Sequence, residues 1–568
     1  RHAKAGFPAE LFDTPWKKTA LEDYLLRCFS REIGRLSFKA KGSGKSGLIA
    51  TSRPGQEVLS RTACEIGRNE ITARFEVGFP AFGRTINSGE LIRIFFDFLP
   101  GCVENVFFYH RQNTAEIKKR ITLADDQQFI RNELKRLDLV SFVADGSILP
   151  RETGVSDRPM KGSVAFHSPD SLRITLNLPG HGPISGMAIH RGITLIVGGG
   201  YHGKSTLLKA LESGVYNNIP GDGREYVITD ETAVKLRAED GRSINHVDIS
   251  LFIRDLPNKK DTTCFSTADA SGSTSQAAAV IESIEAGTRA FLIDEDTSAT
   301  NFMLRDDLMQ RIVSRDKEPI TPFIERARDL YKQAGISTVL VAGSSGAYFF
   351  IADTIIQMDA YRPFDITEMV KNACEQEVSK PAIQAPGFKL PTAGRKLAAD
   401  GTGRAVGAMA LNFGDSRAEA GGESQEEGEN SGRSGRFGNR GGSASDAERF
   451  ERGRGGRRET DRNSDRNTRI KVRVHDKHSF QVAKEPVDLR FVEQLADSEQ
   501  TAALAQMVRY CLEKGLLERC TVQETVATLL KAYEADGLSV FSDASYAAMG
   551  LAMPRVQEIY ACLNRFRG

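Results

Sequence analysis

Apolar and polar residues follow different periods in different parts of the chain, and each period predicts a kind of element. Near the start, helical spacing gives one apolar face, made by Leu21, Leu25, Leu26 and Phe29. Residues 125–139 repeat that spacing and lead into Leu139–Ala144, a mainly apolar run that is typical of a strand. The pattern predicts an N-terminal α/β domain over residues 1–165, with a core of its own.

From residue 166 to 368, short apolar runs alternate with helical stretches. Three of these runs have the mainly apolar character of buried parallel strands: Ile193–Val197, Ala290–Ile293 and Ser337–Ala342. Each is followed by a turn and then by a helix or loop. This alternation predicts an α/β domain around a parallel sheet.

The pattern stops after this domain. Residues 369–394 have the character of a linker, and residues 395–468 are rich in Gly, Arg, Ser, Glu and Asn with almost no large apolar side chains, so we expect disorder there. Arg469–Val474 alternates basic and apolar residues like a half-exposed strand. The C-terminal domain, residues 469–568, is otherwise predicted to be small and helical, with a capping box at Thr521 and Glu524 and a helix start at Pro554.

Composition adds mainly exclusions. The 568 residues contain 76 Lys and Arg against 75 Asp and Glu, a net charge of +1, so overall charge indicates no polyanionic partner. The 8 cysteines form no C-x-x-C pair, which gives no support to a zinc ribbon or a dithiol site and favours a reducing compartment. No apolar run reaches the length of about 18 residues that a membrane span needs, so no membrane insertion is expected. The sequence begins at Arg1, so any targeting peptide would be missing from it.

A complete phosphate-binding motif follows the first of the three strands. Residues 198–205 fit the Walker A pattern G-x-x-x-x-G-K-[ST] between a strand and a helix predicted at Thr206–Leu211. In such a loop, backbone N–H groups surround phosphate oxygens, the lysine bridges the β- and γ-phosphates, and the hydroxyl after it binds Mg²⁺. The predicted ATP-binding residues are Gly198, Gly199, Gly200, Tyr201, His202, Gly203, Lys204, Ser205 and Thr206. The alternative, a glycine-rich turn with a coincidental lysine, is disfavoured by this context.

A second G-K-S string occurs at Gly44–Ser46, but Lys39 stands where the first glycine of the motif should be. No apolar strand leads into it. We therefore interpret residues 41–46 as a basic surface loop.

The strand at Ala290–Ile293 ends in two carboxylates, the Walker B arrangement. Asp294 is predicted to hold Mg²⁺ together with Ser205, and Glu295 to act as the general base that polarises the attacking water, with Lys204 as the second catalytic residue. An acidic strand end is common by itself. Together with the complete Walker A motif upstream, however, it indicates a nucleotide-binding site.

The segment between the two motifs decides the class of phosphate-binding loop. Ser271, Gly272 and Ser273 precede a helix predicted at Ala277–Glu285, in the position of an ABC signature, whose backbone groups cap the γ-phosphate of ATP bound to a partner subunit. As a string this segment is weak, because Ser/Gly turns are common. Residues 298–301, directly after the Walker B carboxylates, fit a D-loop.

These blocks resemble the family of predicted ATPases of the ABC class. The resemblance is dense from residue 75 to 370 and rests on Gly198–Leu208, Gly221–Glu225, Glu239–Arg242, Ala270–Ala278, Asp294–Arg305, Phe79–Arg84 and Phe142–Gly146. It implies an ABC-type P-loop core with ATP and Mg²⁺ as cofactors. The missing N-terminus and the Arg/Gly segment are similar to a kinetoplastid mitochondrial member associated with RNA editing. That similarity implies a location in the mitochondrial matrix and a larger RNA-processing complex, with the cytoplasm as the alternative location.

The chain departs from ordinary ABC ATPases at two places. No histidine lies between residues 330 and 360, so Gly343–Gly346 replaces the switch histidine, and Ser344 or Ser345 could bond a γ-phosphate instead. No glutamine follows Lys204 at the Q-loop distance, where Glu239, Asp240 and Arg242 stand. Hydrolysis that is slow, or used as a timed switch, is thus as plausible as fast turnover. Phe166 and His167 are candidates for the adenine-stacking residue by location only.

One chain has one Walker A motif and one signature. Because an ABC site needs both, from opposite faces, we expect a head-to-tail homodimer.

The Arg/Gly-rich segment resembles RGG sequences, whose arginines pair with phosphates and stack on unpaired bases. It predicts binding of single-stranded RNA, and the alternative is a solvated linker. The predicted RNA-binding residues are Arg433, Arg436, Arg440, Arg452, Arg454, Arg457, Arg458, Arg469, Lys471 and Arg473. The last three could equally be the wet face of a β-ribbon.

The sequence is compatible with four functions. The leading one is a homodimeric ABC-type ATPase that grips or remodels RNA. The others are a nucleotide-gated RNA-binding scaffold with little hydrolysis, the ATPase subunit of a transporter, and a small-molecule P-loop kinase, which the signature and D-loop blocks disfavour.

Overall fold

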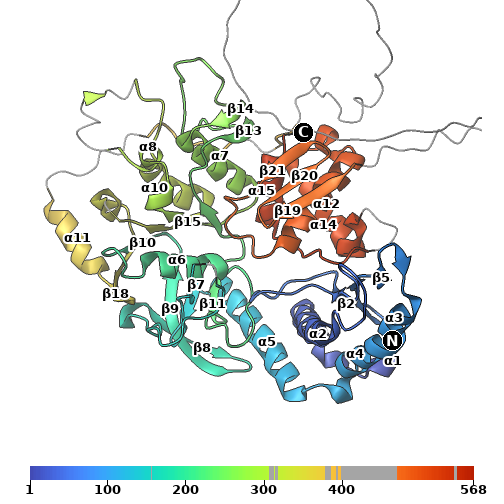
Figure 1. The fold of residues 1–568 in the computed structure, drawn as a ribbon. Coiled ribbons are helices and arrows are strands. Elements are labelled where there is room, and N and C mark those ends of the chain that lie inside the picture. Colours follow the sequence, from blue (N-terminus) through green and yellow to red (C-terminus); the bar gives the residue numbers. More distant parts are fainter. Residues whose placement is uncertain are drawn as a thin grey trace, which may run out of the picture. The chain divides into compact units, whose positions relative to one another are not determined.

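The structure is a computed structural model that describes residues 1–154, 156–305, 312–313, 317–343, 345–377, 385–391, 394–397, 470–542 and 547–567 (Figure 1). The residues before 398 and those from 471 onward belong to one compact unit. Within the described residues, no helix is both long enough and apolar enough to cross a bilayer.

A six-stranded sheet organises the centre of the chain, in the order β12-β15-β16-β10-β17-β18. Its strands are β10 (Ile193–Val197), β12 (Val234–Leu236), β15 (Ala290–Asp294), β16 (Ser337–Val341), β17 (Thr354–Asp359) and β18 (Arg362–Asp365). All neighbours are parallel except the β17–β18 hairpin. The three parallel strands predicted from the sequence are therefore confirmed, and they lie next to one another as β15, β16 and β10.

The register of these strands brings two loops to one level of the sheet. Val341 pairs with Ile196 of β10 on one side and with Asp294 of β15 on the other. Because neighbouring strands lie about 4.8 Å apart, the backbones at Ile196 and Asp294 are roughly 10 Å apart. The ends of β10 and β15 therefore open at the same edge.

Both faces of the sheet are buried against helices. Ile196, Leu292 and Val341 pack into the cluster that contains Leu207 and Leu211 of α6 (Lys204–Ser213). On the other face, residues such as Leu195 and Phe291 share a cluster with α7 (Gly272–Glu285) and α10 (Phe323–Ala334). The same cluster includes the hairpin of β13 (Arg242–Val247) and β14 (Phe265–Ala270) and the short α8 (Thr300–Met303), while α11 (Thr367–Gln376) follows β18.

A second, antiparallel sheet has the order β11-β7-β9-β8. It consists of β7 (Leu139–Ala144), β8 (Arg173–Leu178), β9 (Gly182–His190) and β11 (Val227–Thr229). The sequence predicts β7 correctly as a strand but groups it with the N-terminal domain, whereas it pairs with β9 and β11. The physical reason is its apolar character on both faces, since Val143 and Phe142 enter two different core clusters.

The N-terminal part is mainly helical, with three short antiparallel strand pairs. Its helices are α1 (His2–Ala5), α2 (Pro15–Leu36), α3 (Ser88–Arg93), the π-helix η2 (Ile94–Phe98), α4 (Leu99–Phe107) and α5 (Thr114–Arg136). β1 (Ile49–Ala50) pairs with β4 (Glu76–Val77), while β2 (Cys64–Ile66) with β3 (Ile71–Ala73) and β5 (Ala81–Phe82) with β6 (Thr85–Ile86) form hairpins. The predicted amphipathic helix is α2, and the G-K-S string at Gly44–Ser46 lies in a turn, as expected.

The C-terminal part joins a three-stranded antiparallel sheet to four helices. The elements are β19 (Val472–Asp476), β20 (Ser479–Val482), β21 (Glu485–Asp488), α12 (Ser498–Glu513), α13 (Leu516–Arg519), α14 (Val522–Asp536) and α15 (Val556–Arg565). The capping box at Thr521 and Glu524 is confirmed at the start of α14. Pro554 precedes α15 by two residues, because Arg555 is the N-cap.

Buried ion pairs connect this part to the rest of the compact unit. Arg61 donates to Asp497 at 2.7 Å and to Glu499 at 2.5 Å, and Arg61 itself is only 3% exposed. Arg395, the first residue of the segment expected to lack structure, also makes hydrogen bonds to the compact unit. It donates to Glu285 of α7 at 2.7 Å and to the carbonyl of Asn245 at 2.7 Å. Arg395 is therefore part of the folded unit.

Candidate functional site

The loop Gly198–Ser205 connects β10 to α6, as the sequence predicts, and two of its glycines are required by their surroundings. Gly198 has φ +139°, and a Cβ there would lie 2.3 Å from the carbonyl oxygen of Met358. Gly203, the N-cap of α6, has φ +99°, and its Cβ would lie 2.8 Å from the ring of Tyr361. The loop therefore passes too close to β17 and to the turn after it for any side chain at these positions. Such close backbone passage is what a phosphate cradle needs.

Lys204 lies over this loop. Its ammonium group donates to the carbonyl oxygens of Gly198 at 2.6 Å and of Gly199 at 2.9 Å. The ammonium group is thereby held above the exposed backbone of Gly199 and Gly200. A phosphate entering the loop would meet a positive charge that is already in place.

The turn between β17 and β18 packs against the phosphate-binding loop and makes hydrogen bonds to it. The backbone N–H of Ala360 donates to Nδ1 of His202 at 3.0 Å, and that of Tyr361 donates to the carbonyl of His202 at 3.1 Å. Both turn residues have positive φ, +44° and +66°, which is uncommon outside glycine. The turn thus fixes His202, while the neighbouring Tyr201 is fully exposed.

A hollow of about 730 Å³ adjoins the start of α6. Ser205 and Thr206 line it next to Tyr361, and Met160 and Val164 line it from the loop before β8. Both Ser205 and Thr206 therefore face open space beside the phosphate-binding loop.

The Walker B carboxylates lie at the end of β15. Asp294 is 8% exposed, and one of its oxygens accepts a hydrogen bond from the backbone N–H of Asp296 at 3.3 Å. Glu295 accepts at 2.5 Å from the backbone N–H of Gly343, the residue that follows β16 by two positions. The segment that replaces the switch histidine therefore contacts the predicted general base directly.

The signature segment forms the N-terminus of α7. Ser271 is the N-cap, and its hydroxyl lies 3.0 Å from that of Thr274, whereas Ser273 is 8% exposed. Gly272 is buried in a tight space: a Cβ there would lie 3.2 Å from Asp240 and 3.6 Å from Ala299. The predicted helix thus begins five residues earlier than expected, and only the first part of the signature remains open.

Gln276 connects this helix to the segment predicted as the D-loop. Its side chain donates to the hydroxyl of Ser298 at 3.0 Å and accepts from the backbone N–H of Ala299 at 2.9 Å. Ser298 in turn donates to the carbonyl of Asp294 at 2.9 Å. Sequence reasoning did not identify Gln276 as functional, although a glutamine inside an otherwise Ser- and Ala-rich helix start is visible in the sequence.

The residues at this edge fit ATP with Mg²⁺. The glycine cradle excludes side chains, Lys204 offers a cation, and Ser205 and Asp294 offer the hydroxyl and carboxylate oxygens that Mg²⁺ prefers. Bound Mg²⁺ would neutralise charge on the phosphates. Glu295, oriented by Gly343, is the group that could accept a proton from water.

The expectation for the adenine-stacking residue is wrong for Phe166. Its ring is 2% exposed and packs in the core cluster with Leu172 and Met187, because the strand-like segment around it bonds to Gly146 and Ser147. His167 is exposed and lies 3.0 Å from Arg173. Ser344 lies outside the described residues.

Most of the predicted RNA-binding residues also lie outside the described residues: Arg433, Arg436, Arg440, Arg452, Arg454, Arg457, Arg458 and Arg469. Lys471 and Arg473 are described, and both are exposed at β19. The sheet order places β19 at the open edge of the C-terminal sheet. Four of the five residues of β19 are exposed, which is more than the half-exposed strand that the sequence predicts.

Sequence profiles of known families match three parts of the chain, residues 1–110, 113–390 and 471–568. The P-loop domain of the ABC ATPases matches residues 113–390, and the N-terminal domain of ATPases of the ABC class matches residues 1–110. Together with the parallel sheet and its phosphate-binding loop, these matches show that the chain belongs to the ABC-class ATPases. Residues 471–568 match the C-terminal domain of MRB1590, so the chain is similar to that protein in its last part as well.

Individual relatives are more distant. The uncharacterized protein MJ1628 of Methanocaldococcus jannaschii is 30% identical over 229 residues, which are 39% of this chain and 50% of that protein. Among solved structures, cbiO1 of Clostridium perfringens, part of the ABC transporter complex cbiONQ, is 13% identical with a TM-score of 0.27 over 42% of this chain and 92% of its own. The ATP-binding cassette MJ1267 in its ADP conformation is 13% identical with a TM-score of 0.23, over 34% of this chain and 88% of its own.

Proposed function

We propose that the protein is an ATPase that works as a head-to-tail homodimer and uses ATP-driven closure to grip or remodel single-stranded RNA. The observation that carries the ATPase part is the shared edge of the sheet. At this edge the loop with Lys204 follows β10, and Asp294 and Glu295 lie at the end of β15. Gly343, which bonds Glu295, follows β16, the strand between the other two. This is the set of groups that phosphoryl transfer to water requires.

The homodimer follows from the number of motifs. The chain has one phosphate-binding loop, at the start of α6, and one signature segment, at the start of α7. The two helices pack on opposite faces of the sheet. A site that uses both motifs is therefore best completed by a second copy of the chain.

The RNA part rests on composition and on the C-terminal sheet. The Arg/Gly-rich segment supplies arginines for phosphates and bases, and the exposed Lys471 and Arg473 lie directly after it. The resemblance to an RNA-editing member of the family supports a role in mitochondrial RNA processing, within a larger complex in the matrix. The proposed organisation is an N-terminal domain (1–165), an ATPase domain (166–368), a linker (369–394), the Arg/Gly segment (395–468) and a C-terminal domain (469–568).

One comparison tests the proposal. ATP turnover of the full chain is measured with and without single-stranded RNA, beside Glu295→Gln and beside a deletion of residues 398–468. The deletion starts after Arg395 because that side chain holds α7. We expect RNA to change the turnover of the full chain and not that of the deletion, and Glu295→Gln to abolish turnover in both. An equal effect of RNA on the turnover of the full chain and of the deletion would place the RNA site on the folded part of the chain instead.

A nucleotide-gated scaffold with little hydrolysis is the second candidate. The replacement of the switch histidine by the segment around Gly343 favours it, since a backbone N–H cannot supply a mobile charge. If the wild type and Glu295→Gln turn over ATP equally slowly while ATP still changes RNA affinity, the scaffold is the correct function.

A further inference from the structure

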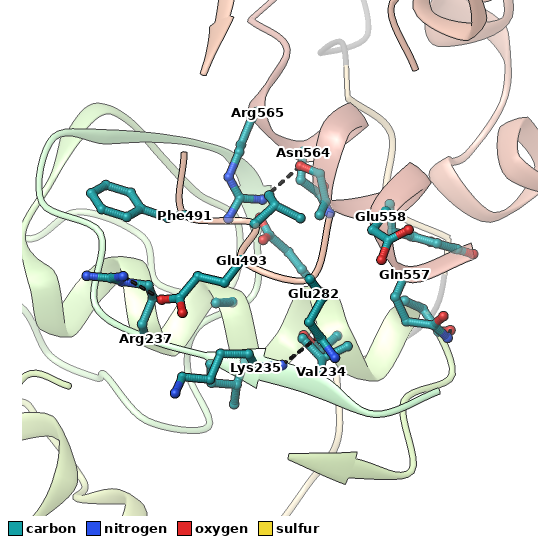
Figure 2. A pocket seen from close by; sticks show the side chains of 18 of the residues that line it. Val234, Lys235, Arg237, Glu282, Phe491, Glu493, Gln557, Glu558, Asn564 and Arg565 are labelled. Carbon is teal, nitrogen blue, oxygen red and sulfur yellow. Dashed lines mark hydrogen bonds and ion pairs between the residues drawn. The ribbon is translucent and has the colours of Figure 1, made fainter. Parts of the chain in front are cut away.

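The C-terminal part of the chain packs against α7, the helix that begins with the signature segment (Figure 2). Figure 2 shows Asn564 and Arg565 of α15 next to Glu282 of α7, in a small pocket between these elements. At the far end of α7, Gln557 of α15 donates to the carbonyl of Ala286 at 3.3 Å. The two helices therefore lie along one another.

One link between them runs through Glu239, which lies between β12 and β13. Arg565 donates from Nε to one carboxylate oxygen of Glu239 at 3.2 Å and from its terminal nitrogen to the other. Glu239 is 4% exposed, so this bidentate pair is shielded from water. Burial alone would raise the pKa of the Glu239 carboxyl, but Arg565 and then Arg242 outweigh it and hold that pKa below its usual value. Glu239 is therefore an anion that depends on its arginines.

The backbone of Glu239 bonds the signature itself. Its N–H donates to the hydroxyl of Ser275 at 2.9 Å, and this hydroxyl donates to the carbonyl of Gly272 at 2.9 Å. Ser275 is fully buried. A shift of Glu239 would therefore move the first turn of α7.

The residues on either side of Glu239 extend the same connection toward the predicted D-loop. The N–H of Ala238 donates to the carbonyl of Thr297 at 3.0 Å, and Asp240 lies against Gly272. Residues 238–240 thus lie between α15 on one side and, on the other, both the signature and Thr297, the residue directly before the D-loop.

From this chain of contacts we infer that Arg565 is a positioning residue: through Glu239 and Ser275 it sets the place of the signature motif, so that the C-terminal part controls closure of the dimer on ATP. The inference rests on the proposed ATPase function. It gives the C-terminal part a defined route to the nucleotide site. A ligand that shifts α15 would change the signature without contacting ATP.

The test uses the full chain and separates nucleotide binding from closure. Affinity for a fluorescent ATP analogue is measured at a chain concentration where the wild type is monomeric, and dimerisation with ATP and Mg²⁺ is measured by sedimentation in a Glu295→Gln background. Arg565→Ala is expected to leave the monomer affinity within about twofold and to weaken ATP-dependent dimerisation about tenfold, within the usual range of coupling between sites. Arg565→Lys keeps the charge and should recover part of the loss.

Arg61→Ala is the matched control. It removes a buried arginine that also holds the C-terminal part, through Asp497 and Glu499, but it has no contact with the signature. Normal dimerisation of Arg565→Ala, or an equal loss in Arg61→Ala, would overturn the inference. If Arg565→Ala does not fold, Glu239→Gln takes its place, and wild-type dimerisation by that variant overturns the inference as well. A wild type that neither dimerises with ATP nor hydrolyses it would instead refute the proposed function.

Discussion

The carboxylate of Glu295 accepts a 2.5 Å hydrogen bond from the backbone N–H of Gly343. A backbone donor of this kind holds the carboxylate in place without competing for a proton. Glutamine at position 295 could keep the same hydrogen bond, because its amide oxygen also accepts.

Glu295→Gln should therefore remove hydrolysis and preserve the fold and ATP binding. A positioned general base contributes roughly 10² to 10⁴ in rate, and we expect kcat to fall by about that factor. Release of phosphate under saturating ATP measures the effect, with affinity for a fluorescent ATP analogue as the control. A loss below about threefold in kcat would mean that another group accepts the proton.

Lys204→Ala should abolish most ATP binding. The ammonium group lies over the loop at 2.6 Å from the Gly198 carbonyl, where a phosphate would be its partner. Hydrogen bonds to charged groups are worth about 1.5–3 kcal/mol, so affinity should fall roughly 10- to 100-fold in a titration with ATP.

Lys45→Ala is the matched control for this prediction, because Lys45 occupies the same place in the other G-K-S string of the chain. That string forms a turn next to the β5–β6 hairpin, with Ser43 and Ser46 bonded to Ala81. An equal loss of ATP affinity in both variants would contradict the assignment of the site.

Gly198→Ala and Gly200→Ala should differ, although the two glycines are two residues apart. A methyl group at Gly198 would lie 2.3 Å from the Met358 carbonyl and require φ near +139°, whereas nothing lies within 4 Å of a Cβ at Gly200. We expect Gly198→Ala to lower the melting temperature and to weaken ATP binding by at least about tenfold, and Gly200→Ala to change the melting temperature little. Thermal unfolding and ATP titration of both variants check this, and equal behaviour of the pair would show that the loop is not confined as described.

Glu22→Gln should stabilise the protein above neutral pH. Burial raises the pKa of Glu22 on α2 to about 7, against the backbone N–H of Ile66, which donates to it at 2.7 Å. Because the folded pKa is above the unfolded one, the folded chain binds more protons between about pH 4.5 and 7, and stability falls as the pH rises through that window. The cost of ionising Glu22 is then fully present above pH 7 and amounts to about 3 kcal/mol.

Glutamine keeps the acceptor for Ile66 and removes the charge, so the variant should gain stability at pH 8 and little at pH 5. Denaturant unfolding at both pH values measures the difference from the wild type. Glu104→Gln, at an exposed ion pair with Arg111, is the control and should show no such difference. A constant difference across the pH range would contradict the assignment of the titrating group.

The sequence predicts those parts of the fold in which local pattern decides structure. β10, β15 and β16 are short, mainly apolar runs, and a run of that kind is typical of a buried parallel strand. The phosphate-binding loop was predicted with them, because its glycines and its lysine are adjacent in the chain. The sheet partners of β7 could not be predicted, because pairing depends on residues far along the sequence.

The same limit applies to the site. Arg565 and Glu239 are 326 positions apart, and nothing near either residue indicates that both are buried. Phe166 shows the reverse error: it was a candidate for adenine stacking by its location alone, but its ring fills the core. Exposure is set by tertiary packing, and it decides which polar and aromatic residues can function.

Lys204 has consequences for how a nucleotide would enter. Because its ammonium group bonds the carbonyls of Gly198 and Gly199, the side chain of Lys204 itself holds the loop together. An arriving phosphate exchanges partners with a group that is in position, so little ordering of the loop accompanies binding. The loop should therefore resist proteolysis equally well with and without ATP, and the structural response to the nucleotide should be found away from the loop, at the surfaces that a second chain completes.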